Sequence, residues 1–128
     1  MRLGISNVDF ETFQHVYAAA RVKPSVVQNR FHARTGYDRD LRAFCAEHEV
    51  EYQGFWTLTA NRDIVNGDVV RGIAQRLGKP VVSVFYAALR QLGVVVLDGT
   101  KDEAHMAEDL ELLRLDEADV AAVDAVLV

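Results

Sequence analysis

The sequence predicts an α/β fold: half of a TIM-type (β/α)8 barrel, with four strand-helix units, parallel strands and an extra carboxyl-terminal helix. Short apolar runs alternate with segments of helical periodicity throughout the chain, which is the pattern of a parallel sheet with right-handed crossovers. The length of 128 residues limits how much of a barrel the chain can form, because a complete barrel of this type takes about 250 residues. The chain therefore has material for roughly half a barrel.

The first unit occupies the amino terminus. We expect a strand at residues 2–6, where Leu3 and Ile5 are apolar. Asp9 can then cap a helix. The apolar residues of that helix recur at helical spacing: Phe10, Phe13, Val16, Tyr17 and Ala20.

The second strand follows Pro24 and contains the β-branched residues Val26 and Val27. We expect it to stop at Gln28, and residues 29–38 to form a long polar loop. Polar residues at the carboxyl end of a barrel strand indicate a binding face, since ligands bind at that end. The alternative is a strand that runs into an ordinary polar loop.

Two further units complete the pattern. A helix is expected at residues 39–47, with Cys45 on its apolar face, followed by a strand at 50–55. After the turn signal Asn66-Gly67, we expect Asp68 to cap a short helix. A second helix at 81–92 follows the break at Gly78-Lys79-Pro80.

The carboxyl-terminal part is expected to hold one strand and two helices. The strand at 94–97 is apolar on both faces, as expected of a strand that is covered on both sides. One helix is expected to begin near Glu103. The last helix, at 116–127, is amphipathic.

Composition limits the function classes. The net charge of −5 argues against a nucleic-acid or anionic-membrane partner, because both require a basic surface. The single cysteine cannot form an internal disulfide and fits a reducing compartment. No membrane span or leader sequence is recognisable, so we expect a cytoplasmic protein with a single domain at residues 1–128.

The sequence does not predict a metal site. The four histidines lack metal-ligand spacing, and Cys45 has no partner cysteine. Cys45 lies on an apolar helix face, where we expect a core residue. The histidines are His15, His32, His48 and His105.

The carboxyl ends of the four predicted strands can be compared with known families. They are Gly4-Ile5-Ser6-Asn7, Val27-Gln28-Asn29, Gly54-Phe55-Trp56-Thr57-Leu58 and Leu97-Asp98-Gly99-Thr100. In this order and spacing they resemble the second half of an aldo-keto reductase, a barrel enzyme that uses NADPH without a glycine-rich Rossmann loop. The resemblance extends over nearly the whole chain.

The resemblance implies a nicotinamide site. Ser6, Asn7 and Gln28 would hold the carboxamide of the ring, and their side chains offer both donors and acceptors. Phe55 would stack against the ring where the family usually has tyrosine. The loop through Leu58 would lie along the pyrophosphate. The alternative is that Phe55 only closes the end of the barrel core.

The resemblance also implies a phosphate site. Gly99 and Thr100, with the helix start near Glu103, would offer backbone donors to a phosphate.

Several departures concern the cofactor. The family commonly has a lysine where this chain has Gly99 and an arginine where it has His105, and both cations normally bind the 2′-phosphate of NADPH. Lys101 could substitute in part, and His105 could instead lie on a solvated helix face. Asp109 replaces an asparagine that contacts the adenine, and Trp56 could crowd the pocket. We therefore expect weak NADP(H) binding with little preference over NAD(H).

The catalytic residues are a larger departure. In the family, the catalytic Asp, Tyr, Lys and His come from the first half of the barrel, which this sequence does not match. None of the tyrosines or lysines occupies a matching place: Tyr17, Tyr37, Tyr52, Tyr86, Lys23, Lys79 and Lys101.

The leading functional interpretation is an NADP-dependent oxidoreductase of aldo-keto reductase type, or its cofactor-binding half, inactive alone. A carbonyl compound would be the substrate. The main alternative is a non-catalytic interaction or regulatory protein that retains the scaffold. A third alternative is a truncated gene product without a function of its own.

The sequence also predicts self-association. A half-barrel has unpaired edges, here residues 2–6 and 94–97, and such edges pair with other chains. Four apolar residues are expected on its uncovered inward face: Leu3, Ile5, Val27 and Val95. A homodimer or larger oligomer is therefore expected. The alternative is that the last helix covers this face through Val120, Val123 and Val126.

Overall fold

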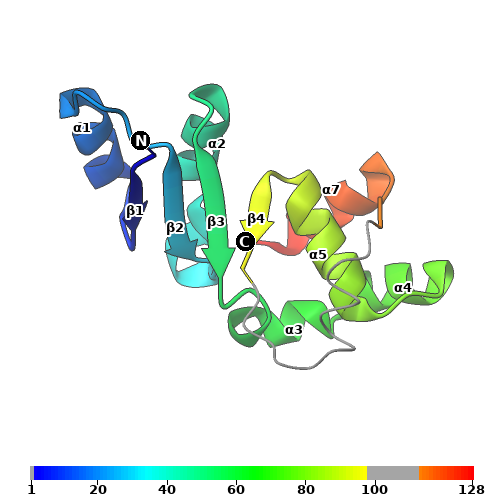
Figure 1. Cartoon of the computed structure of the whole chain (residues 1–128). Coiled ribbons are helices and arrows are strands. Elements are labelled where there is room, and N and C mark those ends of the chain that lie inside the picture. Colours follow the sequence, from blue (N-terminus) through cyan, green and yellow to red (C-terminus); the bar gives the residue numbers. More distant parts are fainter. Residues whose placement is uncertain (1, 98–112) are drawn as a thin grey trace.

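The fold is a four-stranded parallel sheet with helices (Figure 1), and the computed structural model describes residues 2–97 and 113–128. The strand order is β1-β2-β3-β4, and every neighbouring pair is parallel. The strands are β1 (Gly4–Ser6), β2 (Val26–Arg30), β3 (Glu51–Phe55) and β4 (Val94–Val96). The predicted α/β architecture of parallel strands is confirmed.

The α-helices of the described residues alternate with these strands, except that three of them lie between β3 and β4. They are α1 (Phe10–Ala19), α2 (Arg39–Glu47), α3 (Arg62–Val65), α4 (Asp68–Leu77), α5 (Val81–Gln91) and α7 (Glu117–Val126). Two 3-10 segments, Ala33–Asp38 and Thr59–Asn61, follow β2 and β3. The extra carboxyl-terminal helix is confirmed, and the helix expected near Glu103 lies outside the described residues.

Of the two helix caps predicted from the sequence, Asp9 is confirmed, and Asp116, expected as the first residue of the last helix, is also a cap. Asp9 accepts a hydrogen bond from the Thr12 amide at 2.7 Å, and Asp116 caps α7 in the same way. The prediction for Asp68 is wrong, because Gly67 is the cap and Asp68 is the first residue of α4. The Asp68 carboxylate still lies in the first turn, where it is favourable toward the helix dipole.

The second strand is longer than predicted. It pairs with β3 as far as Arg30, whose Cα partner is Phe55. Gln28, Asn29 and Arg30 are therefore strand residues, and the loop expected from residue 29 begins after Arg30. The polar side chains of these residues resembled a loop in the sequence. In the structure they alternate, with Asn29 on the buried face and the other two on the opposite face.

One face of the sheet packs against the helices. A single row crosses all four strands on this face, with the register Ile5-Val27-Tyr52-Val94. The last three are at most 2% exposed, and Ile5 is half-buried. The prediction that Ile5 and Val27 lie on the uncovered face is therefore wrong.

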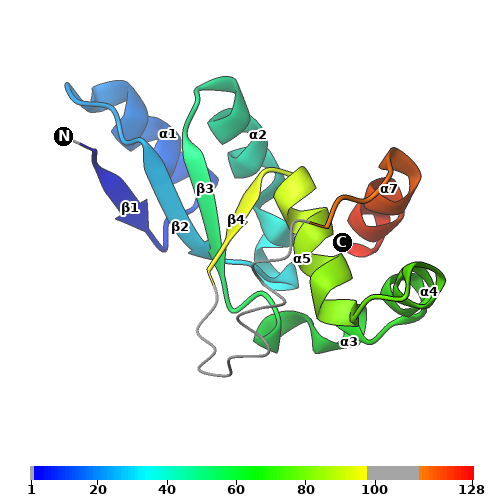
Figure 2. The same cartoon turned by 45° about the vertical axis from the view of Figure 1, so that its right-hand side comes forward.

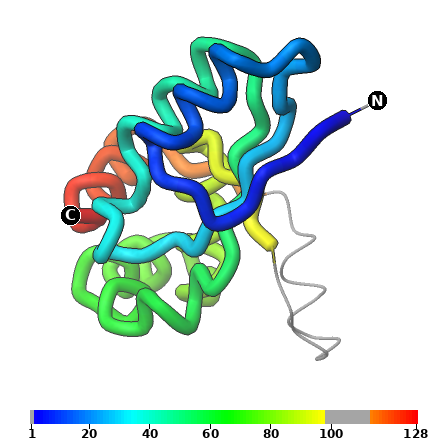
Figure 3. Tube along the Cα trace, turned by 90° about the vertical axis from the view of Figure 1, so that its left-hand side faces the viewer, coloured from blue at the N-terminus to red at the C-terminus, as the bar shows by residue number. Residues whose placement is uncertain are grey.

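No helix of the described residues covers the other face of the sheet, which we call the open face. Figure 2 shows the strands in front, with α1 and α2 behind them, and Figure 3 views the sheet from its β1 edge. Val95 lies on the open face and is 41% exposed, so the expectation that β4 is covered on both sides does not hold for the described residues. The homodimer stays a prediction.

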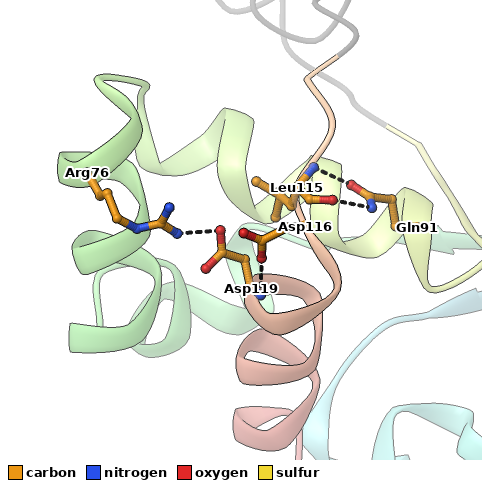
Figure 4. Close-up of polar contacts among 5 residues, drawn as sticks. All are labelled: Arg76, Gln91, Leu115, Asp116 and Asp119. Carbon is orange, nitrogen blue, oxygen red and sulfur yellow. Dashed lines mark hydrogen bonds and ion pairs between the residues drawn. The ribbon is translucent and has the colours of Figure 1, made fainter.

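The carboxyl-terminal helix does not cover the open face, so that alternative is wrong. Helix α7 packs on α4 and α5 (Figure 1). Figure 4 shows its amino-terminal anchors: Arg76 of α4 pairs with Asp119, and the Gln91 side-chain amide bonds both backbone groups of Leu115 at 2.7 and 2.9 Å. The Gln91 side chain thus satisfies both the N–H and the carbonyl group of Leu115.

The end of α7 is held by Arg39, the first residue of α2. Its guanidinium donates to the carbonyl oxygens of Asp124 and Leu127, both at 2.8 Å, and lies 3.0 Å from the Asp124 carboxylate. The last carbonyls of a helix lack partners within the helix, and a cation there is favourable toward the helix dipole. Val123 and Leu127 are fully buried by this docking.

Cys45 is a core residue, as predicted, with 1% exposure. Burial, together with the nearby Asp38 carboxylate, raises the pKa of the Cys45 thiol to about 11. The thiol therefore stays protonated and unreactive at neutral pH. Among the described residues, no helix is long and apolar enough to cross a membrane.

Gly54 of β3 should not tolerate a methyl group. A Cβ atom there would lie 3.0 Å from Val94 Cγ1 and 3.3 Å from Phe31 Cβ. Overpacking of this kind costs about 1–3 kcal/mol, so Gly54→Ala should lower the free energy of unfolding by that amount in urea titrations. The matched control is Gly72→Ala on the exposed side of α4, where the methyl meets open space. It should stabilise by about 0.5–1 kcal/mol, and equal effects of the two changes would contradict this account of the sheet.

Candidate functional site

The open face carries a row of polar side chains. Ser6, Gln28 and Gln53 are Cα partners on three adjacent strands. Gln28 Nε2 donates to Gln53 Oε1 at 3.1 Å, and Gln53 Nε2 donates to Glu51 Oε1 at 2.6 Å. Arg2 extends the row with a weak, exposed ion pair to Glu51 at 3.7 Å. The open face is therefore largely polar, unlike the apolar face that we expected.

Asn7 adjoins this row at the end of β1. Its backbone N–H donates to the Gln28 carbonyl at 3.0 Å, and its φ is 54°. This left-handed conformation is uncommon outside glycine, although asparagine tolerates it better than most residues. It ends β1 and turns the chain along a cleft of about 710 Å³, whose lining includes Asn7 and Arg30.

Phe55 lies on the same face, at the end of β3. It is half-buried and pairs in register with Arg30. Trp56 follows with a φ of 60° and is 54% exposed. The Arg30 guanidinium lies 4.0 Å from the centre of the Trp56 ring, a cation-π distance. The bulky ring therefore stacks on Arg30.

The structure brings together four of the predicted site residues: Ser6, Asn7, Gln28 and Phe55. They lie at the carboxyl ends of adjacent parallel strands, which is the end that binds ligands in barrels. Leu58 lies further along, in the turn after β3, and packs against the core. The other predicted residues lie outside the described part of the chain: Gly99, Thr100, His105 and Asp109.

Sequence reasoning missed two buried asparagines that support this end of the sheet. The Asn29 side chain accepts from the Val8 amide at 3.0 Å and donates to the Val8 carbonyl at 2.7 Å and to Asp38 at 3.0 Å. Asn61 donates to the carbonyls of Phe31 and Thr57, at 2.9 and 2.8 Å. Asn29 could have been found from strand alternation, because it shares the parity of Val27.

The buried tyrosines are committed to these networks. Tyr52 donates to Asp38 at 2.6 Å, and Tyr37 donates to Asn61 at 2.9 Å. Burial raises the pKa of both phenols, and the hydrogen bond to Asp38 raises that of Tyr52 further. A proton donor in carbonyl reduction needs the opposite shift, so neither tyrosine is suited to that role.

Charged groups of both signs lie at the end of β2. Burial is the largest cause of a lowered pKa at His32, followed by the positive charges of Arg30 and Arg34. Asp38 opposes this effect, but its carboxylate is already bonded by Asn29 and Tyr52. Among the described residues, no group of three or more His, Cys, Asp or Glu could hold a metal ion.

The comparisons with known proteins agree on one family. The glyoxal reductase of Bacillus subtilis is 25% identical over 125 residues, which are 96% of this chain and 45% of that protein. An aldo-keto reductase of Mycobacterium marinum is 28% identical over 114 residues, 89% of this chain and 40% of that protein. The chain resembles the aldo-keto reductases. No family model matches the sequence.

Solved aldo-keto reductase structures share the fold. One from a Medee basin deep-sea metagenome library superposes with a TM-score of 0.85 at 19% identity, covering 98% of this chain and 48% of that one. The silkworm Bombyx mori enzyme in complex with NADPH gives 0.78 at 21%, covering 97% and 41%. The chain thus spans less than half the length of these proteins and matches about half of their (β/α)8 barrel.

Tyr52→Phe should weaken the support beneath the site. The change removes the hydrogen bond to the buried Asp38 carboxylate, which remains in place with one fewer donor. The free energy of unfolding should fall by about 1–3 kcal/mol, measured in urea through the fluorescence of Trp56. Tyr17→Phe is the matched control, since the Tyr17 hydroxyl has no hydrogen bond among the described residues. A loss of equal size in both variants would contradict the role given to Asp38.

Proposed function

We propose that the chain is the cofactor-binding half of an NADP-dependent oxidoreductase of aldo-keto reductase type. The observation that carries this proposal is the common location of Ser6, Asn7, Gln28 and Phe55 at the carboxyl ends of β1, β2 and β3. The NADPH complex of the silkworm relative supports the same class of cofactor.

The side chains offer what a nicotinamide carboxamide requires. Gln28 Nε2 already donates to Gln53, so its Oε1 is the atom that would accept from the carboxamide nitrogen. The Ser6 hydroxyl, one strand away, would donate to the carboxamide oxygen. Phe55 would present its ring face to the nicotinamide, which needs no hydroxyl.

In this proposal the hydride and the proton come from different sources. The cofactor would supply the hydride when bound, and this chain would orient its ring. The proton donor would come from the first half of the barrel, which this sequence does not match. Two of the tyrosines support this division, because Tyr37 and Tyr52 are buried and donate to structural hydrogen bonds.

Cofactor binding should depend on Gln28. NADPH and NADH, titrated against Trp56 fluorescence, should bind weakly and with similar affinities. Gln28→Ala should weaken both about tenfold, which corresponds to about 1.4 kcal/mol. Gln14→Ala, the same change on the exposed side of α1, should have no effect. Tight binding of NADPH alone would refute the small preference. No response to either cofactor would favour the non-catalytic interaction protein.

The chain alone should not reduce carbonyl compounds. Loss of a positioned proton donor costs about 10²–10⁴ in rate, and its orienting partners are unmatched as well. NADPH oxidation with a panel of aldehydes should equal that of a heat-denatured control. Steady oxidation above that control, abolished by Phe55→Ala, would show that this chain supplies the catalytic groups itself.

A further inference from the structure

Arg30 adjoins the proposed nicotinamide site but has no part in it. It lies two residues beyond Gln28 on β2, and therefore on the same face, nearer the carboxyl end of the sheet. Its register partner is Phe55. A ligand that stacks on Phe55 would therefore lie next to the guanidinium.

The guanidinium of Arg30 is fixed in place without an anionic partner. It stacks on Trp56 at 4.0 Å, and its Nε atom is shielded from solvent without a hydrogen-bond acceptor. Within residues 2–97 and 113–128 it forms no ion pair, whereas Arg39 and Arg76 are both paired with carboxylates. Protein atoms cover Nε, so the two terminal Nη groups are the donors that a ligand could reach.

The backbone at this point is strained. Trp56 is not glycine, yet its φ of 60° places it in the left-handed region, which costs about 1–2 kcal/mol for an L-residue. Such outliers gather at binding sites, where the surrounding structure holds them in place. Here the strained turn places the indole ring against the guanidinium.

Two arginines and one aspartate act on His32 beside this position. Arg34 and Arg30 both lower the pKa of His32, after the larger effect of burial, so two cations act on one short segment. Asp38 is the acidic group that opposes them, and Asn29 and Tyr52 already donate to its carboxylate. Asp9 and Asp40 also line the cleft, so the case for an anion rests on the guanidinium of Arg30, unpaired within the described residues, and not on a local excess of positive charge.

We propose that Arg30, stacked on Trp56, binds an oxyanion beside the nicotinamide site. The planar fork of a guanidinium suits a carboxylate or a phosphate, which it can hold through two hydrogen bonds. The oxyanion belongs either to a carboxylate next to the carbonyl group of the substrate or to the phosphate of the nicotinamide nucleotide. This assignment of the ligand rests on the proposed function, whereas the binding of an oxyanion does not.

Two pairs of probes separate the sources of the oxyanion. Pyruvate and acetone differ by a carboxylate, and nicotinamide mononucleotide and nicotinamide riboside differ by a phosphate. Each is titrated into the whole chain at millimolar concentration and followed by calorimetry and by Trp56 fluorescence. At least one of the two probes that carry an oxyanion should bind, and its counterpart without the oxyanion should bind at least tenfold more weakly. The pair that shows this difference identifies the source.

Substitutions test the role of Arg30 itself. Arg30→Gln should weaken binding of that anion at least tenfold, and Arg30→Lys should weaken it less, because lysine keeps the charge but loses the fork. Arg71→Gln is the control, since it makes the same change of charge at an exposed position on α4, away from the end of β2. Circular dichroism checks folding, and Arg30→Lys decides the question if Arg30→Gln does not fold.

Three outcomes would overturn the proposal: no probe with an oxyanion binds, the probes without the oxyanion bind equally well, or Arg30→Gln and Arg30→Lys both bind the oxyanion probe as the unaltered chain does. A parallel NADPH titration keeps the two proposals apart. If NADPH binds and no anion depends on Arg30, only this inference fails. If pyruvate depends on Arg30 and NADPH does not bind, only the proposed function fails.

Discussion

The register of β2 with its two neighbours is the constraint on which the rest of this structure depends. Once Val27 pairs with Ile5 and Tyr52, alternation along the strand assigns every other residue to a face. Asn29 must then face the helices, and Gln28 and Arg30 must face the open side. A slip of one residue would bury the Arg30 guanidinium and expose Val27, so the hydrophobic row fixes the position of the polar site.

The buried asparagines connect this register to the loops. Asn29 bonds both backbone groups of Val8, and thereby fixes the chain between β1 and α1 beside the open face. Asn61 joins the ends of β2 and β3 through Phe31 and Thr57. Side-chain amides suit this task because each has two donors and an acceptor, enough to satisfy the carbonyls that a loop leaves unpaired. The rigidity of the site thus comes from residues that the ligand would not touch.

The sequence was sufficient for the strand order and for most helices, because apolar spacing and caps such as Asp9 are local signals. The sequence did not predict on which face of the sheet each strand residue lies. Whether Val27 points toward the helices depends on pairing with β1 and β3, which no local pattern encodes. Likewise, Gln28 was correctly expected near Ser6, but the Trp56 stack on Arg30 depends on a strained turn that tryptophan does not favour. The structure describes no residue of the predicted phosphate site from Gly99 onward.

Because the open face carries polar side chains, a half-barrel of this kind does not need a cover over the whole face. An apolar open face would be unfavourable by about 25 cal/mol per Å² and would have to be covered. Here Gln28, Gln53 and Glu51 bond one another across the strands, so water can solvate the face at small cost. Apolar side chains also lie on this face: Val26 and Phe55 are half-buried, and Val95 is 41% exposed. Any partner that completes the barrel would therefore meet hydrogen-bonding side chains on this face as well as apolar ones.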